Sequence, residues 1–519
     1  MSQDTRSLTQ RTIAGMLWLA SGKAAYAGLQ LVVLAVLARL VSPADFGVVS
    51  AALVVIGFSA IVSQLGLGPA LVQRPDLEPR HVDTAFTASV LFGLALGGVL
   101  WAVAPAVAGF FRTPGVAPVM RALAWVFPLQ GLGTTAESLA RRDLQFRWLA
   151  LLDAKAYGLG YGVVGVGLAL AGWGVWALVA GEVAEAVCRS AILLRSRPPR
   201  LRPTLERRAL RELLYFGSGF TVAKIANFFA VNGDNLVVGR MLGPAALGLY
   251  GRAYQLMSAP AASFGTVLDN ALFPAMARVQ RDLPRLRMAY RHGIALVAVV
   301  VLPVTVALFL LAPEFVHVVL GPRWTDVVLP FQILAAGMVL HTTSKLGDSL
   351  VRATGAVYRR AWRQAVFAVL VIFGSLIGQR WGIAGVACGA MFALSINFLL
   401  MAQLSVSMAE MPWRDFWGAH LPALLVAAAS APIAWVMATA LRHQDLPALV
   451  VLAGAGGLAL AVALVLVWRF PHLFLGRDVR WMLDTLRGMA ARLTGPATLP
   501  AGPAPARSGA ASGRGGEPR

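Results

Sequence analysis

Charged side chains are scarce in this chain: Asp, Glu, Lys and Arg together make up 13% of 519 residues, whereas hydrophobic residues make up 58%. A soluble protein carries about 25% charged residues, so the composition excludes an ordinary soluble globule. Apolar runs of about 20 residues, long enough to cross a bilayer as a helix, recur from residue 13 to residue 468. The sequence therefore predicts an all-α polytopic membrane protein with about fourteen spanning helices.

Cysteine and catalytic motifs are also lacking. Cys188 and Cys388 each lie inside an apolar run and form no CxxC pair, which argues against a disulfide or metal framework. HExxH, GxSxG and Walker sequences are absent from the chain, so the sequence predicts neither an enzyme nor a metal or cofactor site. No cleavable leader precedes the first apolar run, and we expect that run to be retained as a span.

The net charge of +21 comes mainly from Arg residues between the apolar runs. This pattern indicates membrane topology rather than a nucleic-acid surface. Arg gathers in one alternate set of connections, including residues 195–211, which the positive-inside rule places in the cytoplasm together with both termini. The predicted spans are residues 13–38, 45–70, 82–104, 117–138, 148–170, 174–194, 215–239, 246–275, 290–312, 327–351, 362–379, 383–406, 419–440 and 447–468.

One stretch of the chain appears twice. Residues 23–47 recur as residues 224–248 at a constant offset (240 − 39 = 201), and a second echo relates residues 173–181 to residues 381–389. These echoes indicate a duplicated six-helix unit, with the two copies parallel in the membrane. We interpret three matched pairs as structural turns at the outward ends of the helices: Arg39 with Arg240, Pro43 with Pro244, and Gly47 with Gly248.

The duplication sets the predicted domain organisation. The parts are an N-terminal six-helix half (1–194), a cytoplasmic linker with an amphipathic helix (195–214), a C-terminal six-helix half (215–406), two further helices (407–468), an amphipathic helix on the inner leaflet (469–493) and a disordered tail (494–519).

Lysine occurs only four times, and every copy falls inside a predicted span. A charge there costs at least about 2.5 to 3.5 kcal/mol, so such residues usually face a wet cavity or a partner. Lys155 and Lys345 lie near basic helix ends, and snorkelling to the headgroups explains them as well as a cavity does. Lys23 and Lys224 lie deeper and occupy matched positions, so we expect them to oppose each other across a central cavity. Two opposed ammonium groups favour an anion, such as a phosphate or diphosphate.

Other charged residues within the spans complete the predicted site. We expect Arg252 and Lys345 to assist in binding the anion, while Asp234 and Asp269 neutralise cations in the empty cavity. These two carboxylates, together with Asp348 and Glu137, are candidates for ion coupling or charge pairing, and for each one singly a structural ion pair is favoured.

The residues also carry a family resemblance. The opening pattern LARLVSPADFG, its second copy VVGRMLGPAALGLY, and the pair WGVWALVAG and WGIAGVACG resemble polysaccharide-export (Wzx-type) flippases of the multidrug/oligosaccharidyl-lipid/polysaccharide (MOP) superfamily, over residues 1 to about 470. The resemblance implies a V-shaped bacterial inner-membrane flippase that moves an undecaprenyl-diphosphate-linked oligosaccharide from the cytoplasmic to the periplasmic leaflet. The translocated oligosaccharide would be used in the assembly of O-antigen, capsule or exopolysaccharide. Polysaccharide polymerase machinery would then be a partner of the flippase. The resemblance further implies alternating access, a cationic cavity, and proton or sodium coupling.

Two alternatives stay open. An ion-coupled multidrug exporter has the same scaffold, but we would expect carboxylates and aromatic residues, rather than Lys, to dominate its cavity. A membrane glycan polymerase or ligase would be expected to carry a long outer loop, and the outward connections here are short.

Overall fold

The computed structural model describes residues 22, 25–63, 67–74, 76–196, 204–207, 209–211, 221–476 and 478–480. All regular secondary structure in these ranges is helical, which confirms the all-α prediction. Most of the predicted linker helix, the predicted inner-leaflet helix beyond Arg480 and the C-terminal tail lie outside the described residues.

The N-terminal half begins with a helix at Ala25–Leu40. It continues through α2 (Pro43–Ser63), α3 (Leu67–Gln73), α4 (Pro79–Phe110), α5 (Val116–Leu123), α6 (Val126–Arg142), α7 (Phe146–Tyr157), the π-helix η1 (Gly158–Gly165), α8 (Val166–Leu170) and α9 (Val175–Ser196).

The C-terminal part comprises α11 (Thr221–Met241), α12 (Pro244–Arg278), α13 (Leu283–Leu310), α14 (Ala312–Val319), η3 (Pro322–Val327), α15 (Val328–Ala336), α16 (Met338–Ala353), α17 (Val357–Gly378), η4 (Gln379–Trp381) and α18 (Gly382–Met408). It is followed by α19 (Trp413–Gly418), α20 (Leu421–Arg442), α21 (Ala448–Arg469) and α22 (Pro471–Phe474).

The helices identify a multi-pass membrane protein. Among the described residues, seven helical segments are long and apolar enough to cross a membrane, or eight if the bent pair Pro322–Ala336 and Met338–Ala353, which turns by 43°, forms one span. Other predicted spans correspond to helices that are interrupted or more polar, such as α11 with Asp234. The total of fourteen spans stays a prediction.

One span boundary differs clearly from the sequence expectation. The second span was expected to run to residue 70, but α2 ends at Ser63 and α3 is a separate helix. Gly68 and Pro69, both poor residues for the interior of a helix, lie in the first turn of α3, and residues 64–66 between the two helices are outside the described ranges.

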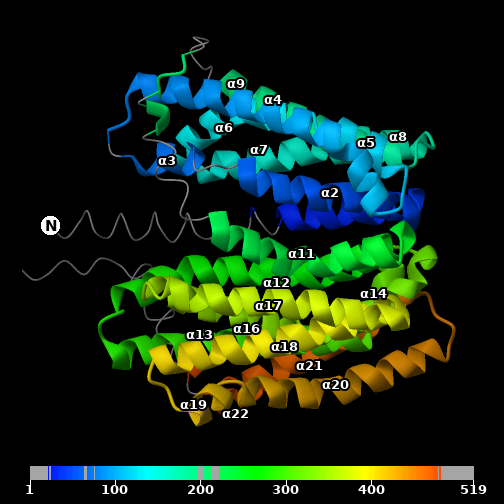
Figure 1. Ribbon diagram of the computed structural model, residues 1–519. Helices are drawn as coiled ribbons and strands as arrows, with labels where there is room; N and C mark the ends of the chain where they lie inside the picture. The colour runs from blue at the N-terminus through cyan, green and yellow to red at the C-terminus, as the bar shows by residue number, and fades with distance from the viewer. Residues whose placement is uncertain are drawn as a thin grey trace, which may run out of the picture.

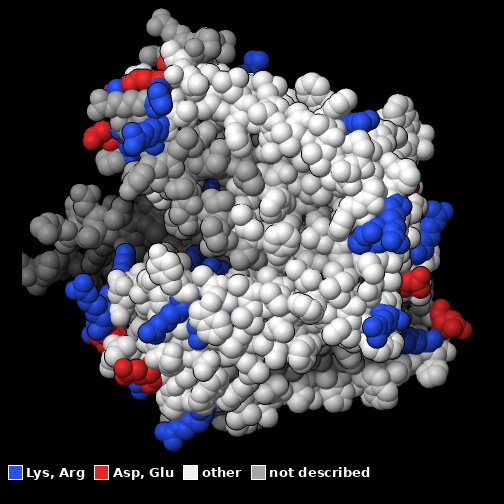
Figure 2. Space-filling view, in the orientation of Figure 1, with Lys and Arg blue, Asp and Glu red and all other residues white. Residues whose placement is uncertain are grey.

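The two halves lie side by side, with α2 of the first half against α11 and α12 of the second (Figure 1). At one end of the bundle, where α2 and α12 begin and α4 ends, the halves are in close contact; we call this the crossing end. At the opposite end, Figure 2 shows a hollow between the halves in which basic side chains are visible. We call this the open end.

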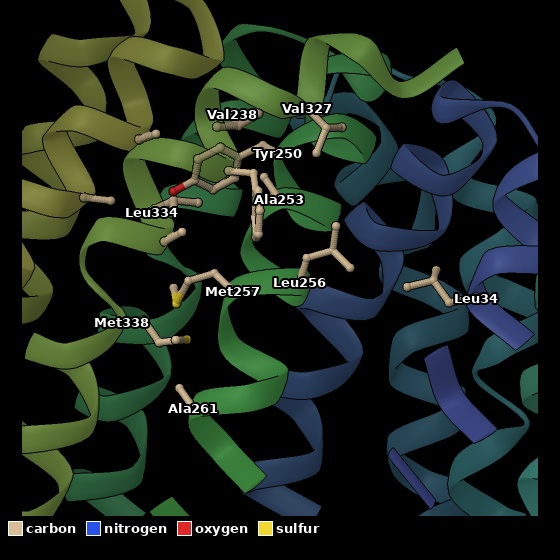
Figure 3. Close-up of a cluster of buried hydrophobic side chains, with 14 of the residues drawn as sticks. Leu34, Val238, Tyr250, Ala253, Leu256, Met257, Ala261, Val327, Leu334 and Met338 are labelled. Atoms are coloured by element: carbon tan, nitrogen blue, oxygen red, sulfur yellow. The ribbon is translucent and has the colours of Figure 1, made fainter. Parts of the chain in front are cut away.

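Helix α12 forms the core of the contact between the halves. Figure 3 shows Leu256 turned towards the helix that carries Leu34, while Met257 faces Met338 of α16. All four side chains are at least 95% buried. One face of α12 thus packs against the first half and another face against α16 of its own half, so any movement of one half against the other must change the packing on the first of these faces.

Candidate functional site

The repeated sequence forms a reciprocal crossing between the halves. A Cβ atom built on Gly47 would overlap the carbonyl of Pro244, and one built on Gly248 would overlap the carbonyl of Pro43. Glycine is therefore required at both places, because the backbone of each helix occupies the space of the other's side chain. We call these four residues the crossing.

Local sequence explains why α2 starts at the crossing. The Ser42 hydroxyl accepts a hydrogen bond from the backbone N–H of Asp45 at 3.2 Å and donates to the Asp45 carboxylate at 2.7 Å. Pro43 occupies the first helical position, where its missing N–H costs nothing. In the second copy, Gly243 adopts φ +88° and Pro244 begins α12. The matched residues thus lie at turns, as interpreted from the sequence, and they also join the two halves.

The matched arginines reach across the same interface in opposite directions. Arg39 of the first half donates to the carbonyl oxygens of Val318 and Val319 in the second half, at 2.6 and 3.0 Å. Arg240 of the second half lies over the Phe110 ring of the first, 5.6 Å from the ring centre. Each copy therefore uses its arginine to hold the other copy.

A buried tryptophan strengthens the crossing end. Trp324 is fully buried, and its indole N–H donates to the carbonyl oxygen of Ala38 in the other half at 2.8 Å. Its ring packs edge to face against Phe46, with 5.4 Å between the centres. The other neighbour of Phe46 is Arg252, whose guanidinium carbon lies 4.4 Å from the ring centre. This cluster closes the crossing end.

Arg252, a predicted anion ligand, lies close to this closed end. It is eight residues from the start of α12, or about 12 Å along the helix. Besides Phe46, it contacts the side-chain oxygen of Gln255 by a hydrogen bond, and its Nε atom is buried without a hydrogen-bond partner. No carboxylate in the described part of the chain forms an ion pair with it.

Lys345, another predicted ligand, projects from α16 towards α12. Its Cδ atom would lie 3.2 Å from a Cβ built on Gly265, and the lysine is partly buried. Within the described residues its ammonium group makes no hydrogen bond or ion pair. Helix α16 thus presents a cation that has no hydrogen-bond or ion-pair partner among the side chains that the structure describes.

Lys224 lies near the start of α11, where its backbone is described but its side chain is not, and Lys23 lies outside the described residues. Measured along their helices, Lys224 is about 26 Å from the crossing end and Gly265 about 32 Å. Lys224 and Lys345 therefore lie at similar depth, whereas Arg252 lies about 20 Å closer to the crossing end than Gly265. The structure does not bring all the predicted ligands to one level.

The predicted carboxylates have various surroundings. Asp234 is 2% exposed and accepts a hydrogen bond from the Tyr250 hydroxyl at 2.7 Å, with no cation partner among the described side chains. The side chain of Asp269, on α12, is not described. Asp348 pairs with Arg360 at 2.6 Å.

Glu137 belongs to an ion-pair network within the first half. It contacts Arg141 at 2.7 Å and Arg189 at 2.9 Å, and Arg189 also contacts Asp153 at 3.0 Å. Charged groups on α6, α7 and α9 are thereby tied together at the open end of that half.

Comparisons with known proteins place this geometry in a family. The family profile described as "Polysaccharide biosynthesis protein" matches residues 36–329, more than half of the chain. The chain belongs to this polysaccharide biosynthesis protein family. The match includes the whole crossing and both arginines that support it.

Individual relatives agree with the family assignment. The succinoglycan biosynthesis transport protein ExoT of Rhizobium meliloti is 30% identical over 69% of this chain and 74% of its own length. The lipopolysaccharide biosynthesis protein WzxC of Escherichia coli is 24% identical over 76% of this chain and 80% of its own. Among solved structures, the lipid II flippase MurJ in an inward closed conformation superposes with a TM-score of 0.72 at 12% identity, covering 86% of this chain and 97% of that one. The predicted family resemblance and the MOP fold are confirmed.

Two glutamates that the sequence analysis did not select are further candidate site residues in this member of the polysaccharide biosynthesis protein family. Glu182 and Glu185 lie on α9, three residues apart, and face the π-helix η1. Glu182 accepts a hydrogen bond from the Tyr161 hydroxyl at 2.7 Å. No ion pair to either glutamate occurs among the described residues. The signal in the sequence was the spacing of three, which places both carboxylates on one helical face.

Glycines explain how these glutamates come so close to η1. A Cβ on Gly160 would lie 2.5 Å from the Glu185 backbone nitrogen, and one on Gly181 would lie 2.9 Å from the Tyr161 ring. The Gly-rich run therefore permits close helix packing, as is usual for small residues in membranes. A π-helix at this position is notable because π-bulges are frequent at functional sites.

A final charged cluster joins Asp478, which follows α22 and lies outside the spans, to the first part of α13. Asp478 contacts Arg291 at 3.0 Å and His292 at 3.3 Å. Burial acts to raise the pKa of Asp478, but the hydrogen bond from His292 and the charge of Arg291 outweigh it and hold this pKa below its usual value. The cluster fastens the segment after α22 to α13.

Proposed function

We propose that this protein is a flippase that moves an undecaprenyl-diphosphate-linked oligosaccharide across the bacterial inner membrane during polysaccharide assembly. Family membership supports this function, as does a relative named as a succinoglycan biosynthesis transport protein. Because such relatives are transport proteins, a transporter is favoured over a glycan polymerase or ligase. The likeness to MurJ supports the fold on which the proposal depends.

The proposed orientation follows from the Arg-rich connections. The positive-inside rule places the open end and both termini in the cytoplasm and the crossing end at the periplasmic face. Arg352 and Arg359, both exposed and both near the open end, agree with this orientation. In this state the hollow faces the compartment in which the cargo is assembled.

The observation that carries the proposal is the contrast between the two ends of the bundle. The crossing brings backbone against backbone at one end, while a hollow separates the halves at the other (Figure 2). A lipid-linked glycan can therefore enter from the cytoplasmic leaflet, and it can leave only after the crossing separates. This is an alternating-access cycle in which the described conformation receives cargo.

We assign the diphosphate to the lysines near the open end. Lys345 supports this role because its ammonium group has no partner within the described residues, and Lys224 lies at a similar depth on α11. Lys23 occupies the matched position in the first half. A diphosphate provides oxygens for several ammonium groups. Arg252 lies closer to the crossing, where it would meet the anion after the first step of the passage.

We assign ion coupling to the pair Glu182 and Glu185, with a proton as the coupling ion. These two carboxylates lie on one helical face and have no ion-pair partner among the described residues. Ionisation of both at once is therefore disfavoured. Asp348 and Glu137 suit this role less well, because each already pairs with arginine. Asp234, which accepts a hydrogen bond from Tyr250 and has no cation partner among the described side chains, is a second candidate.

The experiment is flipping in liposomes that contain the purified protein and a fluorescent lipid-linked oligosaccharide, with glycan exposure read by an added glycosidase. Lys345→Ala and the double variant Lys23→Ala/Lys224→Ala should each reduce the rate at least about tenfold, since a hydrogen bond to a charged group contributes roughly 1.5 to 3 kcal/mol.

Lys155→Ala is the matched control, because Lys155 also lies in a predicted span but has an exposed side chain. It removes the same charge and should leave the rate unchanged. Full activity in the lysine variants would contradict the diphosphate assignment. Failure of the wild-type protein to flip any lipid-linked oligosaccharide supplied would contradict the flippase itself.

A further inference from the structure

A hollow opens on the outer surface of the first half, away from the central cavity. It measures about 280 Å³ and lies between α4, α5 and α6. Its lining includes Leu94, Gly97, Gly98, Trp101, Arg121 and Trp125. Arg121 is the only charged residue in the lining.

Glycine creates the space. A Cβ on Gly97 would lie 2.9 Å from the carbonyl oxygen of Ala124, so this glycine permits α4 to approach the α5–α6 region. A Cβ on Gly98 would meet nothing within 4 Å, because it points into the open hollow. The two glycines thus leave the α4 side of the hollow open, and the apolar side chains of Leu94, Trp101 and Trp125 line the rest of it.

Arg121 has no anionic partner in the described part of the protein. Its guanidinium carbon lies 4.7 Å from the centre of the Trp101 ring, and its Nε atom is buried without a hydrogen-bond partner. Within the described ranges, this side chain forms neither a hydrogen bond nor an ion pair. A guanidinium group in an apolar setting favours a bound anion, and phosphate matches its forked geometry well.

The hollow lies at the depth of lipid headgroups. Arg121 is five residues from the start of α5, about 7.5 Å along the helix from the crossing end. Trp101 and Trp125 flank it with 52% and 62% of their surface exposed. Exposed tryptophans gather where the hydrocarbon core meets the headgroups, so Arg121 is at the level at which phospholipid phosphates occur.

We infer that this hollow binds one anionic phospholipid, with its phosphate on the Arg121 guanidinium group and one acyl chain over Gly98. The anionic class follows from charge. A lipid with net negative charge neutralises Arg121, whereas the amine of a zwitterionic lipid would find no carboxylate in the lining. The inference concerns a lipid that stays on the protein surface and does not depend on the transported cargo.

The test is native mass spectrometry of the full chain in detergent, with phosphatidylglycerol and phosphatidylcholine of equal acyl chains added in turn. The wild-type protein should retain one phosphatidylglycerol with about tenfold preference, as expected for a charge-assisted phosphate contact. Arg121→Gln should abolish this preference. Arg323→Gln, which removes an exposed arginine at the crossing end, should keep it.

A second variant tests the acyl chain. Gly98→Leu fills the hollow without meeting any atom of the protein within the first 4 Å of its Cβ, so it should fold normally and retain neither lipid. The proposed site would be overturned if Arg121→Gln kept the wild-type preference for phosphatidylglycerol, or if Arg323→Gln lost that preference to the same extent. Undiminished lipid retention in Gly98→Leu would also overturn it. Binding without any headgroup preference in the wild-type protein would do the same.

Discussion

Adding one methyl group at the crossing should destabilise the described conformation. In Gly47→Ala the new Cβ would overlap the Pro244 carbonyl and lie only 3.0 Å from its Cα atom, so α2 and α12 must move apart. Overpacking of this kind costs about 1 to 3 kcal/mol. If the alternative conformation lacks this contact, the equilibrium between the two should shift about 5- to 150-fold towards it.

The matched control is Gly57→Ala in the same helix. Its Cβ would lie 3.5 Å from the Phe228 ring, an ordinary contact. Both substitutions replace Gly by Ala inside α2, so the gain in helix propensity, up to about 1 kcal/mol, is common to both. The difference between them therefore isolates the steric effect at the crossing.

The assay is the distance between spin labels on opposite halves, measured by electron paramagnetic resonance after replacement of Cys188 and Cys388. Labels at Pro114 and Arg323, both exposed at the crossing end, should separate in Gly47→Ala and keep their wild-type distance in Gly57→Ala. An unchanged distance distribution in Gly47→Ala, in a protein that still folds, would refute the idea that the crossing closes this end.

Three further predictions follow from named contacts. Trp324→Phe removes the hydrogen bond to Ala38 and should separate the same labels, with a cost of about 1 to 3 kcal/mol for the carbonyl left without its donor. Glu182→Gln should make flipping in liposomes insensitive to an imposed pH gradient, whereas Tyr161→Phe, which keeps the carboxylate, should retain the response. The pKa of Asp478 is lowered in the folded protein, so its stabilisation is present above the usual Asp value of about 3.9 and is lost as the pH falls through the lowered value. Asp478→Asn should therefore weaken the acid dependence of thermal unfolding, measured by light scattering between about pH 5 and pH 2.

Much of the architecture was predictable because its signals are local. Long apolar runs identify membrane helices whatever the partners of those helices are, and the all-α fold and the family followed from the sequence. The repeated residues from Arg39 to Gly47 and from Arg240 to Gly248 also stood out, since charged and turn-forming residues are rare in such a chain. What these residues contact was not predictable, because each reaches into the other half, about 200 positions away in the chain.

The candidate site was less accessible to sequence reasoning. Lysine in a span indicates a functional position, but depth along a helix is needed to see that Arg252 lies far from Lys345. Glu182 and Glu185 escaped selection because nothing in the sequence shows that they face a π-helix, whose register differs from that of an ordinary helix. Arg121 likewise could not be selected from the sequence, because its place in an apolar hollow depends on how α4 packs against α5.

The reciprocal crossing has a consequence for the ancestry of the fold. Because each half offers the same arginine, proline and glycine to the other, a single six-helix chain bearing one copy of this loop would carry every group needed to pair with an identical chain in the same membrane orientation. In such a homodimer, one copy of the loop sequence would form both contacts across the interface. The two arginines of this chain now have different partners, since Arg39 donates to backbone oxygens and Arg240 lies over an aromatic ring.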